Sequence, residues 1–436
     1  MISEALRQLL VGAQDAERRG DWAAAASCYE QALPLLPDDH RLPTNLGNAL
    51  WLANQPDAAR EAFEQAAAMA PQAPVPLRGL GNALRDLNAF EQADAAYGQA
   101  LQLDNDPLTA WNHSQLLLGL ERYSEAYAAA ERRLELAAML PYREGPYASA
   151  SEHPSLRGEP SELPLHLWSE QGLGDTLQYV RWICLLAEQP NAITLEVEHQ
   201  LVGLLQQGLS WLPHPPQVVA KPRDGTAAPA IEAAQAPLMS LAHHLGQAPL
   251  PYEAGYLRSG DWSKPRNASR SQPRIGLVWA SGCKLDAGFT SREYHKRSLP
   301  PQMLGALVEA LHLAGAQLVN LQVGVDRKAA DGLESSFSSA LDPQADFAAT
   351  AAVVRQLDLV ITVDTAMAHL CGALDQPAWV LLPYSADPRW LRQRSDTPWY
   401  QSLRLWRQPR SGDWLALVDR LVAALPAWWA ELSSLA

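Results

Sequence analysis

Small and aromatic positions recur with a step of 34 residues over the first quarter of the chain. Self-alignment places alanine at 25, 59 and 93 and again at 32, 66 and 100, with an aromatic residue at 29, 63 and 97. Each unit reads as two amphipathic helices, with small residues where the helices cross and an aromatic ring between them. Pro37 and Pro71 keep the same step and end the second helix. The pattern predicts three helix-pair repeats and a degenerate fourth from about Leu108 to Leu136.

These units resemble tetratricopeptide repeats, which stack into a curved array with a concave face suited to an extended peptide or a partner protein. The first helices of the repeats carry three asparagines that are candidate contacts to a peptide backbone, namely Asn45, Asn48 and Asn82. The alternative is that these side chains are solvated or form hydrogen bonds within the array. Residues 1–105 carry 7 basic and 14 acidic side chains, a net charge of −7. This charge favours a neutral or basic partner.

After the repeats, short apolar runs alternate with helical patterns. Runs typical of strands lie at 163–169, 193–197, 217–220, 275–281, 317–323, 358–363, 378–383 and, as an edge strand, 403–406. Such alternation predicts parallel sheets with helices on both faces. Proline-rich linkers lie near 141–160 and 249–273, and a final helix is expected from about Gly412 to Ser433. We therefore predict a repeat domain at 1–138, a first α/β domain at 155–255 and a second at 270–436.

The first candidate site segment follows the first α/β strand directly. It reads Ser-Glu-Gln-Gly-Leu-Gly-Asp-Thr over residues 169–176. Gly172 and Gly174 permit a sharp turn and close approach of a ligand to the backbone. Asp175 is expected at a helix N-terminus at the carboxyl end of the strand, where ligands of parallel sheets bind. The alternative is that Asp175 only caps that helix.

The second candidate segment follows the run 358–363. Asp364 and Thr365 precede small residues, and a helix N-terminus that begins with small residues offers its N–H groups to an anion. His369 falls about one turn later on the same side, where it either contacts a ligand or packs in the core. Two opposing α/β halves would place this segment across from Asp175, so we expect the two to converge on a shared site.

Positive charge is concentrated late in this acidic chain. Lys296 and Arg297 precede a predicted helix start at Ser298-Leu299-Pro300. Six arginines lie within 22 residues, namely Arg389, Arg392, Arg394, Arg404, Arg407 and Arg410. They predict either a solvated surface or a site for a phosphorylated ligand.

Several blocks resemble one bacterial family. They are SEQGLGDTLQYVRW (169–182), RIGLVWASG (274–282), HKRSLP (295–300), LDLVITVDTAMAHLCGAL (357–374) and RSDTPWYQSLRLWRQPRSGDW (394–414). In this family, tetratricopeptide repeats are fused to a GT-B glycosyltransferase domain similar to the ADP-heptose:lipopolysaccharide heptosyltransferases of glycosyltransferase family 9. The resemblance covers nearly the whole chain. It implies a GT-B fold of two Rossmann-like α/β domains behind an α-solenoid.

The resemblance also implies residue roles. Asp175 matches the acidic residue proposed as catalytic base. The donor and phosphate contacts implied are Gly174, Lys296, Arg297, Asp364, Thr365, Ala366, Met367 and His369. Lys284 or Arg297 could replace Lys296, because the loop 281–298 is unlike that of the family. Further candidate substrate contacts are Gln171, Gln178, Trp279, Arg394, Asp396 and Trp399.

The function expected is inverting, metal-independent transfer of a sugar from a nucleotide-sugar to an acceptor, without a bound cofactor. No DxD pair stands in a loop suited to Mg²⁺. The acceptor could be a protein or peptide held by the repeats, a glycan or a lipid. The alternative is a non-catalytic repeat scaffold with a degenerate transferase-like domain. An epimerase of similar fold lacks specific support.

The composition of the chain excludes several classes of protein. The chain has 436 residues, a net charge of −14 and 47% hydrophobic residues, which excludes extensive disorder and disfavours nucleic-acid binding. No apolar run reaches the roughly 18 residues of a membrane helix. Cys28, Cys184, Cys283 and Cys371 lie far apart without CxxC spacing, which argues against disulfides or zinc. A cytoplasmic location is expected.

Overall fold

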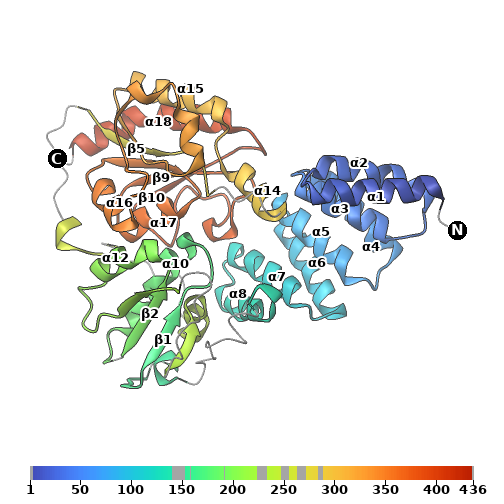
Figure 1. Ribbon diagram of the computed structural model, residues 1–436, viewed down its shortest axis with the longest axis horizontal. Coiled ribbons are helices and arrows are strands. Elements are labelled where there is room, and N and C mark those ends of the chain that lie inside the picture. Colours follow the sequence, from blue (N-terminus) through green and yellow to red (C-terminus); the bar gives the residue numbers. More distant parts are fainter. Residues whose placement is uncertain are drawn as a thin grey trace. The chain divides into compact units, whose positions relative to one another are not determined.

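The computed structural model describes residues 3–139, 153–157, 159–190, 192–222, 233–246, 255–262, 272–282 and 288–434. The chain forms two compact units. We call the first the repeat unit; it comprises Met1–Leu136, Lys284–Lys296 and Tyr384–Arg392. We call the second the α/β unit; it comprises Ala137–Cys283, Arg297–Pro383 and Gln393–Ala436. Each is described by itself below, with its elements labelled as in Figure 1.

The repeat unit is built from antiparallel helix pairs stacked in chain order (Figure 1). Its helices are α1 (Glu4–Arg18), α2 (Trp22–Ala32), α3 (Arg41–Leu52), α4 (Pro56–Met69), α5 (Pro74–Asp86), α6 (Phe90–Leu103), α7 (Pro107–Gly119) and α8 (Tyr123–Ala130). The helix-pair repeats predicted from the sequence are therefore confirmed. In the fourth pair, the second helix is shortened to α8 and continues as a 3₁₀ segment, Glu131–Glu135.

The 34-residue step has a direct packing cause. Phe63 and Tyr97 are almost fully buried, and each lies against a glycine of a neighbouring helix. A Cβ at Gly47 would lie 2.8 Å from the Phe63 ring, and one at Gly81 would lie 2.7 Å from the Tyr97 ring. The small residue and the aromatic ring must therefore recur together for the helices to approach this closely.

A second periodic feature was not predicted from the sequence. The first helix of each pair ends in a residue with a left-handed backbone: Gly20 (φ 71°), Asn54 (φ 59°), Asn88 (φ 60°) and Glu121 (φ 60°). The residue after each one donates its N–H to a carbonyl five positions back, for example Gln55 N to Leu50 O at 2.9 Å. These are Schellman-type helix ends, in which glycine and asparagine are favoured.

The α/β unit contains two parallel sheets. The first has the order β3-β2-β1-β4, with β1 (Leu165–Trp168), β2 (Ile193–Val197), β3 (Gln217–Ala220) and β4 (Ala234–Pro237). The second has the order β10-β9-β8-β5-β6-β7, with β5 (Arg274–Val278), β6 (Gln317–Asn320), β7 (Phe337–Ala340), β8 (Leu359–Val363), β9 (Ala378–Leu382) and β10 (Leu403–Arg407). Every described strand pair is parallel. The predicted α/β class is confirmed, including β10 as an edge strand.

Helices follow most of these strands. In the first half they are α10 (Leu173–Tyr179), α11 (Ile183–Leu186), α12 (His199–Gly208) and α13 (Leu241–His244); in the second they are α14 (Gly288–Arg297), α15 (Pro301–Leu313), α16 (Phe347–Val354), α17 (Ala366–Ala373) and α18 (Trp414–Ser434). α14 belongs to the repeat unit apart from its last residue. Among the described residues, we find no helix whose length and apolar character would let it cross a bilayer.

The strand order reverses once in each sheet. In the first sheet this happens between β1 and β4, and in the second between β5 and β8. In open α/β sheets, ligands bind at the carboxyl ends of the strands beside such a reversal. α10 follows β1 and α17 follows β8, and these two helices pack against each other within the α/β unit (Figure 1). The fold thus brings together the two segments singled out in the sequence.

Candidate functional site

Asp175 lies in the first turn of α10, as expected. β1 ends at Trp168, and α10 begins at Leu173. One oxygen of the half-buried Asp175 carboxylate accepts a hydrogen bond from the Gly172 N–H at 3.1 Å. The carboxylate therefore does cap the helix, which was the alternative to a catalytic role. The two roles are compatible, because a carboxylate accepts several hydrogen bonds.

A polar cluster beside α10 was missed in the sequence. Ser169, Glu198 and Lys221 are the residues immediately after β1, β2 and β3. Glu198 accepts hydrogen bonds from Ser169 Oγ at 2.9 Å and from Lys221 Nζ at 2.8 Å. Thr176 Oγ1, one residue after Asp175, lies 3.4 Å from the same carboxylate. The signal that could have found them is their shared position, one residue past a strand.

The second segment begins where β8 ends. Thr365 is the N-cap of α17, and its Oγ1 accepts from the Met367 N–H at 3.1 Å. Asp364 is buried, and Arg297 Nη1 lies 3.9 Å from its Oδ2. Burial lowers the pKa of Arg407 to about 10, although the nearby Asp364 carboxylate acts in the opposite direction. Two guanidinium groups therefore stand beside one carboxylate at the start of α17.

Gly174 of α10 lies directly against His369 of α17. A Cβ built on Gly174 would lie 2.8 Å from His369 Cδ2 and 3.5 Å from the Cα of Ala366. His369 is 3% exposed, and its Nδ1 forms a hydrogen bond with the hydroxyl of Tyr400 at 2.9 Å. The backbone of the Asp175 turn thus lies directly on the histidine ring. The two predicted segments are therefore in contact in the α/β unit, and their sharing of one ligand site stays a prediction.

A buried arginine next to this contact also escaped sequence analysis. Arg181 is fully buried, and its guanidinium carbon lies 5.0 Å from the ring centroid of Tyr256, 5.3 Å from that of Trp399 and 4.7 Å from that of Tyr400. Its Nη1 donates to the Trp399 carbonyl at 3.0 Å. Burial raises the pKa of Tyr256 well above its usual range. Arg181 joins α10 to the Trp399–Tyr400 segment and so supports the His369 contact.

The other predicted substrate contacts differ in their exposure. Trp399 is buried against Arg181 and Trp182, and the carbonyl of the buried Gln178 accepts from Arg181 Nε at 2.9 Å. Gln171, four residues before Asp175 in the sequence, is exposed. Trp279, directly after β5, is buried and donates through Nε1 to the Asp326 carbonyl at 3.0 Å. Both tryptophan rings are thus packed inside the α/β unit, and their contact with substrate stays a prediction.

The six late arginines are divided between the two units. Arg389 pairs with Asp387 at 3.0 Å and Arg392 with Glu91 at 3.0 Å, both in the repeat unit. In the α/β unit Arg394 pairs with Asp396 at 2.7 Å, Arg410 pairs with Asp413 at 2.9 Å, and Arg404 lies over the Trp406 ring. Arg407 is the member placed beside Asp364.

Lys296 and Arg297 are neighbours in sequence but belong to different units. Lys296 lies in the repeat unit and pairs with Glu293 at 2.7 Å. Arg297 belongs to the α/β unit. Lys284 lies outside the described residues. The described part of the chain contains no group of three or more His, Cys, Asp or Glu side chains arranged to hold a metal ion.

Comparison with known proteins supports the repeat assignment. The tetratricopeptide repeat family model matches residues 44–72 and 79–107. Protein FlbA of Caulobacter vibrioides is 25% identical over 502 aligned residues, which cover 94% of this chain and 82% of that protein.

Solved structures of other proteins resemble part of this chain. MamA is 16% identical, with a TM-score of 0.29 over 32% of this chain and 75% of that chain. The tetratricopeptide domain of Sgt2 from Aspergillus fumigatus is 20% identical, with a TM-score of 0.26 over 28% of this chain and 82% of that chain. It is the family-model match that shows tetratricopeptide repeats, which are suited to protein interaction, and a parallel α/β region follows them.

Proposed function

We propose that the protein is a nucleotide-sugar-dependent glycosyltransferase of the GT-B type, which transfers a sugar with inversion and without a metal to an acceptor recruited by the repeats. The observation that carries this proposal is the contact between Gly174 and His369. It joins the first turns of two helices that each follow a strand at the reversal of strand order. Two parallel sheets that meet in this way are suited to a donor held by one and an acceptor held by the other.

In the proposed reaction, Asp175 is the general base. Its carboxylate takes the proton of the acceptor group while the acceptor attacks the anomeric carbon from the face opposite the leaving nucleoside diphosphate. The Gly172 N–H holds one carboxylate oxygen at 3.1 Å and so fixes its orientation. Glu198, held by Ser169 and Lys221, lies beside the same helix and is placed to orient the acceptor.

The negative charge that develops on the leaving diphosphate is stabilised at the start of α17. The N–H groups of the first turn after Thr365 carry the positive end of the helix dipole. Arg297 and Arg407 add positive charge beside Asp364. Removal of one such donor typically costs about 2.7–4 kcal/mol of activation free energy.

The test of the base is Asp175→Asn, with Asp346→Asn as the matched control. Asp346 caps α16 in the same unit by accepting from the Ala349 N–H at 2.8 Å. Asparagine keeps a side-chain oxygen that can accept the same backbone N–H, so each substitution should leave its helix start largely intact. A thermal-shift screen with UDP-, GDP-, ADP- and dTDP-sugars first identifies the donor, because ligand binding raises stability by mass action.

We expect Asp175→Asn to abolish sugar transfer while the calorimetric affinity for the nucleoside diphosphate stays within about threefold of wild type. Asp346→Asn should retain both properties. Undiminished turnover of Asp175→Asn would remove this residue as the base.

The phosphate contact is tested by two adjacent substitutions. Arg297→Ala should weaken nucleoside diphosphate binding measured by calorimetry, because it removes a guanidinium at the start of α17. Lys296→Ala removes a cation that pairs with Glu293, and its effect is expected to be smaller. His369→Ala should weaken binding through loss of the packed ring. Unchanged affinity in all three variants would place the nucleotide elsewhere.

A non-catalytic scaffold is the second candidate function, favoured by the repeats themselves. The discriminating observation is nucleoside diphosphate release that begins only when an acceptor is added. Absence of binding to every nucleotide-sugar in the screen, combined with binding of a protein partner, would favour the scaffold.

A further inference from the structure

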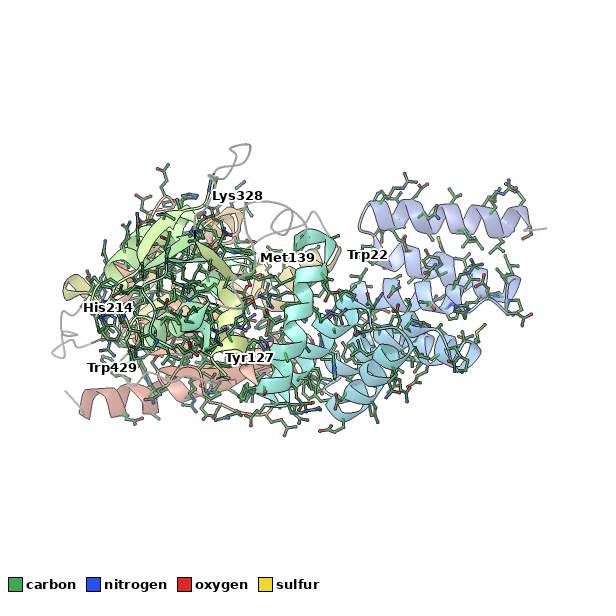
Figure 2. The ribbon with its side chains drawn as sticks, turned by 90° about the horizontal axis from the view of Figure 1, so that it is seen from below. Trp22, Tyr127, Met139, His214, Lys328 and Trp429 are labelled. Atoms are coloured by element: carbon green, nitrogen blue, oxygen red, sulfur yellow. The ribbon has the colours of Figure 1, made fainter. Side chains whose placement is uncertain are left out.

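One helix of the repeat unit comes from a distant part of the sequence. α14 (Gly288–Arg297) follows β5 along the chain, yet residues up to Lys296 are part of the repeat unit. Gly288, the first residue of α14, lies against Trp22 at the start of α2; Trp22 is labelled in Figure 2. A Cβ on Gly288 would lie 2.4 Å from Trp22 Cζ2. α14 is therefore packed against the repeat helices at close range.

Arg292 is the centre of this contact. Its side chain is 1% exposed and forms an ion pair with Asp86, which is itself 5% exposed. Nε donates to the Trp51 carbonyl at 2.7 Å, and the guanidinium carbon lies 4.6 Å from the Trp51 ring centroid. Nη2 also donates to Asn54 Oδ1 at 3.3 Å. We call Trp51, Asn54 and Asp86 the arginine site.

The arginine site is prearranged by the repeat helices. Trp51 Nε1 donates to Asp86 Oδ2 at 2.7 Å, which fixes the carboxylate beside the indole ring that the guanidinium covers. Planar stacking on an aromatic ring together with a carboxylate partner is a geometry that arginine satisfies and lysine does not. The site is therefore selective for a guanidinium.

The repeat architecture does not require Asp86. The positions 34 residues before and after it are Leu52 and Leu120. An aspartate that is almost fully buried where the neighbouring repeats carry leucine needs a specific partner, because an unpaired buried charge is costly. Arg292 is that partner, and it comes from 206 residues away.

Phe289 provides a second, weaker anchor. Its ring stacks on Trp51 with centroids 5.8 Å apart while remaining 49% exposed. Phe289 and Arg292 are three residues apart on α14, so they lie on one helix face. The occupant is thus defined by an aromatic residue and an arginine one turn apart, and its positive charge matches the net charge of −7 of residues 1–105.

We propose that the arginine site is a recognition site for helical segments that present an arginine three residues after an aromatic side chain, and that α14 fills it as an internal ligand. A partner protein with such a segment competes with α14 for Trp51, Asn54 and Asp86. This proposal does not depend on the transferase reaction.

The test uses the full chain and a labelled synthetic peptide of residues 288–297, GFTSREYHKR. Fluorescence anisotropy measures its binding to wild type, to Arg292→Ala and to Phe289→Ala. The wild-type site is occupied by a tethered ligand at a high effective concentration, so the free peptide should bind wild type at least about tenfold more weakly than either variant. Phe289 is half exposed, so its removal is compatible with folding even if Arg292→Ala is not.

Two controls locate the contact. A peptide with alanine in place of the arginine should bind Phe289→Ala at least about tenfold more weakly than the natural peptide. Adding Asp86→Asn to Phe289→Ala should remove peptide binding. Adding Asp94→Asn instead should not, because Asp94 pairs with His113 and Arg122 of the fourth helix pair. Equal affinity of the peptide for wild type and both variants, or affinity independent of its arginine, would overturn the proposal.

Discussion

The substitution Gly174→Ala tests the packing on which the candidate site depends. Gly174 lies in α10, and a Cβ there would lie 2.8 Å from His369 Cδ2. Real Cβ contacts fall at about 3.4–4 Å, so the ring or the helix must shift by more than half an ångström. His369 cannot turn away freely, because it is buried and hydrogen-bonded to Tyr400.

Two opposing effects set the magnitude. Alanine in a helix interior is more favourable than glycine by about 0.5–1 kcal/mol. Overpacking of a well-packed contact costs about 1–3 kcal/mol. Gly305 provides the matched control, because it lies in α15 of the same unit and a Cβ there meets no atom within 4 Å. Gly174 is the second residue of α10 and Gly305 lies inside α15, so the helix gain is at most as large in Gly174→Ala, and any loss relative to Gly305→Ala beyond about 1 kcal/mol reports the clash.

The assay is native-state hydrogen exchange read by mass spectrometry on fragments that cover α10, α17 and α15. We expect protection of α10 and α17 in Gly174→Ala to fall by about 5- to 150-fold relative to Gly305→Ala, which corresponds to about 1–3 kcal/mol. Gly305→Ala should raise protection of α15 slightly. If Gly174→Ala left α10 and α17 as protected as the control does, the close contact with His369 would be refuted.

Further predictions concern the repeat unit. Gly79→Ala would place a Cβ 2.2 Å from the buried ring of Phe63. It should therefore lower the free energy of unfolding by about 1–3 kcal/mol in urea titrations. A Cβ at Gly98 meets no atom within 4 Å, so Gly98→Ala should raise the free energy of unfolding by about 0.5–1 kcal/mol. Burial acts to raise the pKa of Asp86, but Arg292 and nearby cations outweigh it and lower this pKa to about 2. A lowered carboxyl pKa contributes stability that is fully present above about pH 4 and lost as the pH falls through about 2, here about 2 kcal/mol. Acid titration of wild type should show this loss, and Asp86→Asn should lack it while being less stable at neutral pH.

Strands rich in apolar and branched residues could be predicted from the sequence, and those without them could not. β2, β8 and β9 read Ile-Thr-Leu-Glu-Val, Leu-Val-Ile-Thr-Val and Ala-Trp-Val-Leu-Leu, and their bounds agree with the expected runs. β4 and β7 read Ala-Gln-Ala-Pro and Phe-Ser-Ser-Ala and were not predicted. Both are sheet-edge strands, where pairing on one side and neighbouring elements decide the conformation more than propensity does.

The candidate site was predictable as far as it depends on topology. Asp175 and the turn after β8 could be placed at carboxyl ends of parallel strands, because strand–helix alternation alone gives that geometry. The roles of Lys296 and Arg297 could not be separated, since adjacency in sequence does not reveal that they belong to different compact units. Glu198 and Lys221 were missed because each stands alone after its strand, and the carboxylate–ammonium contact between them depends on strand order.

In each unit a buried arginine joins segments that are far apart in the sequence, and the sequence alone did not predict either contact. In the α/β unit, Arg181 is surrounded by three aromatic rings and bonds the Trp399 carbonyl, 218 residues away. In the repeat unit, Arg292 covers Trp51 and bonds its carbonyl, 241 residues away. A buried guanidinium is costly unless its donors and its flat faces are all occupied. Such a residue therefore joins segments that are far apart in the sequence, and its aromatic and hydrogen-bonding partners mark contacts that the sequence alone does not reveal.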